Sequence, residues 1–71
     1  MGISPAEIGL KPRDVRILQA LADGLTVKQI CEKEQLSVTR LYSEIKKLIK
    51  TMKATTRSNA VASALRMEII D

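Results

Sequence analysis

The chain has 71 residues, a net charge of +4 and a hydrophobic fraction of 45%, with a single aromatic residue, Tyr42. This length predicts one domain, near the lower limit for folding without disulfides or bound metal. One cysteine excludes an intramolecular disulfide, the lack of histidine argues against a zinc site, and no apolar run approaches the ~20 residues of a membrane span. Since no signal-peptide pattern opens the chain either, we expect a soluble, cytoplasmic protein.

The first ten residues contain Gly2, Pro5 and Gly9, a composition that predicts a lead-in or linker before a domain at residues 11–71. Pro12 suits the first position of a helix, because the N–H that proline lacks would be unpaired there. Gly24 is expected to end this helix in the left-handed conformation. The apolar residues of this first helix are Val15, Ile17, Leu18, Leu21 and Ala22.

A short second helix is predicted after Thr26, which forms a capping-box pattern with Gln29. This helix carries Cys31, which we expect to be a small buried core residue. Ser37 is then expected to cap a long third helix, and Thr56 a last helix that runs to Met67. The predicted inner stripe of the third helix is Val38, Leu41, Ile45, Leu48 and Met52, and that of the last helix is Ala60, Val61, Ala64 and Leu65.

No strand-like alternation occurs in the chain, so the predicted fold class is all-α, a four-helix bundle. Its positive charge is concentrated between Ser37 and Arg57, where six basic residues face one acid, while the rest of the chain has six basic residues and seven acids. Such a helix is typical of a surface presented to a polyanion. Two short helices and a tight turn, with a basic amphipathic second helix, predict a helix-turn-helix that fits the ~12 Å DNA major groove.

Four stretches, in register from Leu10 to about Ala64, resemble one family. Leu10–Leu18 is similar to a Leu-Thr-Pro-Arg-Glu opening, and Ala22–Ile30 to an Ala-x-Gly-x-Ser-Asn-Lys-Glu-Ile core. Leu36-Ser37 matches a hydrophobic-Ser turn, and Arg57–Val61 matches an Asn-Arg-x-Glu-Ala-Val block. Together they resemble the LuxR/GerE-type DNA-binding domain of bacterial transcription regulators. Sigma-factor region 4 domains share the helix-turn-helix core, but the last block favours the LuxR type.

The resemblance implies that residues 37–53 form a recognition helix for double-stranded DNA. It implies contacts to base edges by Tyr42, Ser43 and Lys46. Contacts to phosphate are expected from Thr26, Lys28, Ser37, Thr39, Arg40, Lys47, Lys50 and Arg57. It further implies a homodimer on two facing half-sites, through an open face with Met67, Ile69 and Ile70.

Several positions depart from the family pattern. Tyr42 replaces a usual cation and is either a base or sugar-phosphate contact or a neutral surface residue. Glu44 replaces a histidine; it either pairs within the helix with Arg40 or Lys47, or accepts from a cytosine amine. Glu34 stands where a buried leucine is usual. The family's recognition helix reads Thr-Val-Lys-x-His where this chain has Arg40-Leu41-Tyr42-Ser43-Glu44.

The preferred interpretation is a transcription regulator's DNA-binding domain, either the output end of a longer response regulator of a two-component system or a stand-alone regulator. RNA polymerase is a further candidate partner. The alternative is a protein-interaction module that keeps the fold, has lost DNA binding and acts on another regulator through its last helix. Without histidine, a glycine-rich phosphate loop or clustered carboxylates, an enzyme is not expected, nor are a metal, a cofactor or a small-molecule site.

Overall fold

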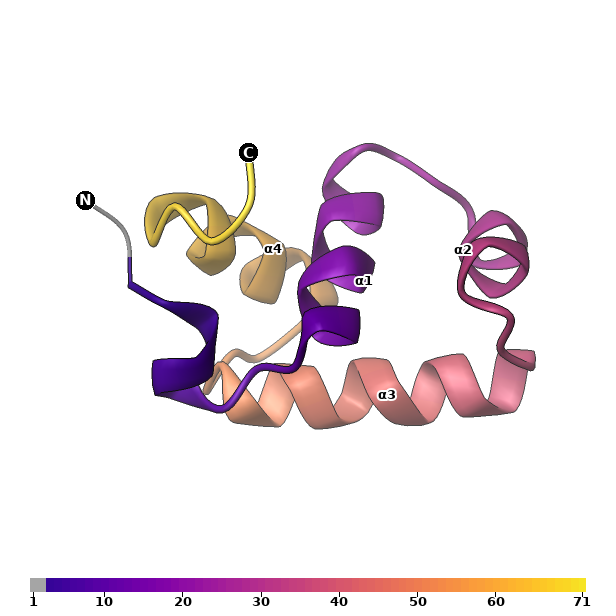
Figure 1. Cartoon of the computed structure of the whole chain (residues 1–71), viewed down its shortest axis with the longest axis horizontal. Coiled ribbons are helices and arrows are strands. Elements are labelled where there is room, and N and C mark those ends of the chain that lie inside the picture. Colours follow the sequence, from indigo (N-terminus) through magenta and orange to yellow (C-terminus); the bar gives the residue numbers. More distant parts are fainter. Residues whose placement is uncertain (1–2) are drawn as a thin grey trace.

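The computed structural model describes residues 3–71, which form four α-helices (Figure 1). They are α1 (Pro12–Ala22), α2 (Val27–Glu34), α3 (Val38–Thr51) and α4 (Arg57–Arg66), preceded by a 3-10 helix at Pro5–Ile8. Residues 3–71 contain no strand, so the predicted all-α class with four helices is confirmed. Among residues 3–71, we find no helix that combines the length and the apolar character that a membrane span needs.

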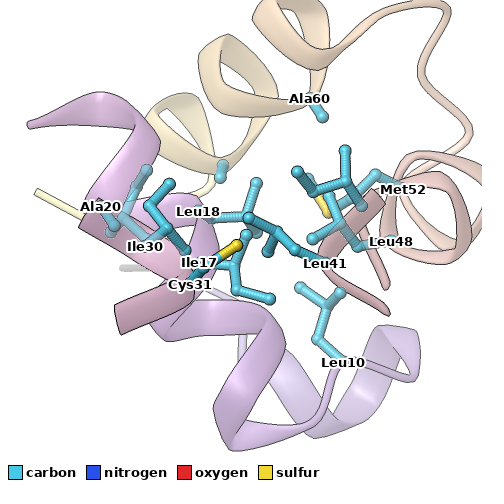
Figure 2. Packing of buried hydrophobic residues seen from close by; sticks show 13 residues of the cluster. Leu10, Ile17, Leu18, Ala20, Ile30, Cys31, Leu41, Leu48, Met52 and Ala60 are labelled. Atoms are coloured by element: carbon cyan, nitrogen blue, oxygen red, sulfur yellow. The ribbon is translucent and has the colours of Figure 1, made fainter. Parts of the chain in front are cut away.

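The long helix α3 forms one side of the molecule, and α1, α2 and α4 all lie on its other side (Figure 1). Both α1 and α3 contact each of the other helices. The core between them is purely aliphatic apart from sulfur atoms (Figure 2). Its buried residues are Leu10, Ile17, Leu18, Ala20, Ile30, Cys31, Leu41, Ile45, Leu48, Met52, Ala60, Ala64 and Ile70. The predicted burial of the cysteine is thereby confirmed.

Residues 3–10 pack against the helices, although the predicted boundary between a lead-in and a domain stays a prediction; residues 1–2 lie outside the described residues. Pro5 begins a helical turn, and Gly9 ends it in the left-handed region with φ of 89°. The turn brings Ile8 against the core and buries Leu10 within it. The backbone N–H of Ile3 donates to the Met67 carbonyl at 3.2 Å, which ties this segment to the end of α4.

Two residues of the predicted inner stripes face solvent instead. Val38, the first residue of α3, is 51% exposed. Leu65 is 44% exposed, because α4 packs through the completely buried Ala60 and Ala64. Small side chains at these two positions let α4 approach the core closely, and Leu65 then lies to one side of the contact.

The predicted helix starts are confirmed. The Thr26 hydroxyl accepts from the backbone N–H of Gln29 at 3.1 Å, and the Gln29 side chain accepts from the backbone N–H of Thr26 at 2.8 Å. The Ser37 hydroxyl accepts from the backbone N–H of Arg40 at 3.1 Å. The Thr56 hydroxyl caps α4 in the same way. These bonds satisfy N–H groups that have no partner inside the helices.

The four α-helices end alike. Each is followed by a residue in the left-handed conformation, and the backbone N–H of the next residue donates to a carbonyl in the last turn of the helix. Gly24 ends α1 with φ of 84°, as predicted. The other three ends use Gln35, Lys53 and Glu68, with φ of 57°, 55° and 59°. A side chain in this region costs roughly 1–2 kcal/mol, which glycine avoids. Three helix ends are therefore strained where one is relaxed.

We therefore expect Gln35→Gly to stabilise the protein by about 0.5–1 kcal/mol, because glycine fits the left-handed end of α2 without strain. Urea denaturation monitored by circular dichroism measures the change. Lys33→Gly, two residues earlier in the body of α2, is the matched control and should destabilise by about 1 kcal/mol. Equal losses in both variants would show that the end of α2 is not strained.

Candidate nucleic-acid interface

The side of α3 that faces away from the other helices carries the candidate site. Because α3 buries Leu41, Glu44, Ile45 and Leu48 on one side, most of its other residues point outward. We call this exposed set the α3 outer face: Thr39, Arg40, Tyr42, Ser43, Lys46, Lys47 and Lys50. No other helix of the part of the chain that the structure describes lies over this side of α3 (Figure 1).

Cations dominate this side of the molecule. Five cations lie on α3 or directly after it: Arg40, Lys46, Lys47, Lys50 and Lys53. None of the five has an ion-pair partner within residues 3–71. Lys46, Lys47 and Lys50 also line a shallow hollow beside Ser43. Unpaired charges of one sign on one helix create a positive potential that attracts an anion. The arrangement therefore suits a chain of phosphates.

Every residue predicted to contact DNA is exposed. This holds for the predicted base-edge residues Tyr42, Ser43 and Lys46, and for the eight predicted phosphate contacts Thr26, Lys28, Ser37, Thr39, Arg40, Lys47, Lys50 and Arg57. The hydroxyls of Thr26 and Ser37 accept bonds as helix caps, which leaves each O–H free to donate. Their contacts to DNA stay predictions.

The lone aromatic side chain lies next to a cation from another helix. Tyr42 is 48% exposed, and the guanidinium carbon of Arg57 is 5.9 Å from the centroid of its ring. A cation over an exposed aromatic ring contributes about 0.5–1 kcal/mol. Arg57, the first residue of α4, thus adds a further positive charge beside the α3 outer face.

Glu44, the acid of α3, is turned away from the α3 outer face. Its side chain is only 9% exposed, and its Oε1 lies 3.7 Å from Nη1 of Arg13 in α1. The predicted pair with Arg40 or Lys47 is therefore wrong. The burial of this carboxylate also argues against a bond to a cytosine amine. The cause is its place at the edge of the buried stripe, where the first turn of α1 crosses α3.

Glu34, the last residue of α2, is held by two arginines of α1. Its side chain is 6% exposed. Nε of Arg16 donates to both carboxylate oxygens at 3.1 Å, and these bonds raise the pKa of Arg16 above its ordinary value. Nε of Arg13 lies 4.0 Å from Oε1 of Glu34. We call Arg13, Arg16, Glu34 and Glu44 the Arg–Glu network.

Sequence reasoning missed this network, although a signal for it was present. Glu34 and Glu44 both occupy positions next to core residues, where an acid needs a partner. Arg13 and Arg16 are three residues apart, which puts them on one side of α1. What the sequence lacked was the crossing of α1 over the other two helices.

The residues predicted for an open dimer face are placed differently. Ile70 is buried in the core, so the prediction of an open face is wrong for it, while Met67 and Ile69 are half-buried and their part in a dimer stays a prediction. The chain turns back after α4, and the backbone N–H of Asp71 donates to the Gln19 side chain at 3.0 Å. The exposed apolar part of α4 is instead a hollow lined by Leu21, Ala22, Arg57, Ser58, Val61, Ala62 and Leu65.

We expect Glu34→Ala to destabilise the protein by about 1–2 kcal/mol, because it leaves Arg13 and Arg16 without their shared acceptor. The value is modest because both arginines remain partly open to solvent. Urea denaturation measures it. Glu32→Ala is the matched control: this acid is exposed on the same helix and has no ion pair within residues 3–71. Equal effects of the two variants would contradict the importance of the network.

The chain was also compared with other proteins. Comparisons with protein-family models, with curated proteins and with solved structures give no match. The chemistry of the α3 outer face therefore rests on this chain's own residues.

Proposed function

We propose that this chain binds double-stranded DNA in a sequence-specific manner, as the DNA-binding domain of a bacterial transcription regulator. The observation that carries the proposal is the α3 outer face, where every cation lacks an ion-pair partner within residues 3–71 and the one acid of α3 is held against α1. Three residues, 35–37, join α2 to α3, as fits a helix-turn-helix. The resemblance to the LuxR/GerE type supports the same function, with a cytoplasmic location and RNA polymerase as a further partner.

In this proposal α3 enters the major groove. An α-helix with its side chains is about 10–12 Å wide, which fits a groove of ~12 Å. Lysines and arginines along the helix then contact phosphates and supply most of the affinity. Lys46 can donate to guanine acceptors, while Tyr42 and Ser43 contact neighbouring base edges. Arg57 orients the ring of Tyr42 at the protein–DNA boundary.

A second candidate function uses α4. Leu65 is 44% exposed and shares its hollow with Leu21 and Val61, so an apolar patch remains open beside α1. Such a patch suits either a second copy on DNA or, in a protein that has lost DNA binding, another regulator. In both cases the contact would use Leu65 rather than the buried Ile70.

Titration against duplex DNA at several salt concentrations tests the proposed function. Each phosphate contact contributes about −0.9 to the slope of log K against log salt, so four or five contacts predict a slope of roughly −4. Fluorescence anisotropy of a labelled duplex gives the binding constants. A flat response, or no binding at low salt, would contradict DNA binding and favour the second candidate.

The same assay tests sequence-specific binding when it compares a duplex selected from a random library with a mismatched duplex. If Lys46 contacts a base, Lys46→Ala should cost about 1–3 kcal/mol more on the selected duplex than on the mismatched one. Arg66→Ala, which removes one charge from α4, is the control and should not discriminate between the two. Equal losses for Lys46→Ala would make this residue a phosphate contact.

A further inference from the structure

The acid of α3 stands very close to two of the cations that the proposed function needs. Around the helix axis Glu44 is about 40° from Arg40 and about 60° from Lys47, since each residue advances by about 100°. Glu44 and Lys47 also line one hollow between α1 and α3. Pairs of opposite charge at these spacings form readily on a helix surface. A free Glu44 carboxylate would therefore pair with Arg40 or Lys47.

In the structure Glu44 pairs with Arg13 of α1 instead. Nη1 of Arg13 lies 3.7 Å from Oε1 of Glu44, and no other ion pair of Glu44 is present within residues 3–71. Glu34, unlike Glu44, does not depend on Arg13 for its pairing, because Arg16 donates to both of its carboxylate oxygens. Nε of Arg13 is buried without a hydrogen bond, while the side chain as a whole is 37% exposed. Among the described residues, Arg13 is thus the cation that holds Glu44 against α1.

We propose that Arg13 is a positioning residue for DNA binding, which keeps Arg40 and Lys47 available to phosphates by holding the Glu44 carboxylate against α1. The inference rests on the proposed function. Without Arg13, Glu44 competes with DNA for one of the two cations, and the protein loses the equivalent of one phosphate contact. Arg13 itself lies in α1 and is not part of the α3 outer face.

The test compares binding of one duplex to the wild type, Arg13→Met and Arg13→Met/Glu44→Gln at several salt concentrations. Methionine keeps the apolar stem of the side chain and removes the guanidinium. At ~0.1 M salt the loss of one phosphate contact predicts about 8-fold weaker binding by Arg13→Met, with a slope less steep by about 0.9. The double variant, which has the wild-type net charge, should regain both the affinity and the slope.

Two controls separate positioning from charge. Arg13→Met/Glu32→Gln has the same net charge as the rescued variant, but it removes an exposed acid of α2 and should stay as weak as Arg13→Met. Arg66→Ala removes one positive charge away from the network and should change binding less than twofold. Circular dichroism establishes that each variant is folded.

The outcomes are distinct. Binding by the wild type with a steep slope, but no rescue of Arg13→Met by Glu44→Gln, would overturn the inference and leave the proposed function standing. A flat slope in the wild type would overturn both. If Arg13→Met does not fold, Glu44→Gln alone decides: about 8-fold tighter binding would mean that Glu44 already competes with DNA, whereas a change of less than twofold supports its sequestration by Arg13.

Discussion

The rest of the structure depends on the packing of α3, because one side of this helix forms part of the core and the other side is the α3 outer face. Leu41, Ile45 and Leu48 recur at helical spacing and form the side of the core on which α1, α2 and α4 rest. The same spacing turns the α3 outer face toward solvent, and four of its seven residues are cations. The core and the positive face are therefore two consequences of one sequence pattern. A substitution that rotated α3 would damage both.

The Arg–Glu network links this helix to its neighbours by charge rather than by apolar contact. Two acids, Glu34 and Glu44, are almost fully covered, and burying a charge is costly unless it is paired. Arg13 and Arg16 provide the pairing from α1, so the network joins three helices without a net charge. Well-packed apolar residues in such places are often as stable. In the proposal, the ion pair with Arg13 has a further effect, because it keeps the Glu44 carboxylate away from the cations of α3.

Local features of the fold could be predicted from the sequence, and features that depend on helix crossing could not. The caps at Thr26 and Ser37 were predictable because their hydrogen bonds span three residues. The exposure of the α3 outer face followed from helical periodicity alone. The partner of Glu44 lies 31 residues away on α1, so no local pattern identifies it. Val38 and Ile70 were misplaced for a similar reason, because their burial is set by where neighbouring segments begin and turn.

The central claim is that α3 meets DNA with its outer face, while α4 beyond its first residue, Arg57, stays outside the contact. Backbone amide shifts in a nitrogen–proton correlation spectrum, recorded as a duplex is added, test it most directly. The account predicts that the largest changes fall on Tyr42, Ser43 and Lys46, with little change at Ala62 and Leu65. Changes centred on α4, or none on α3 at low salt, would contradict it.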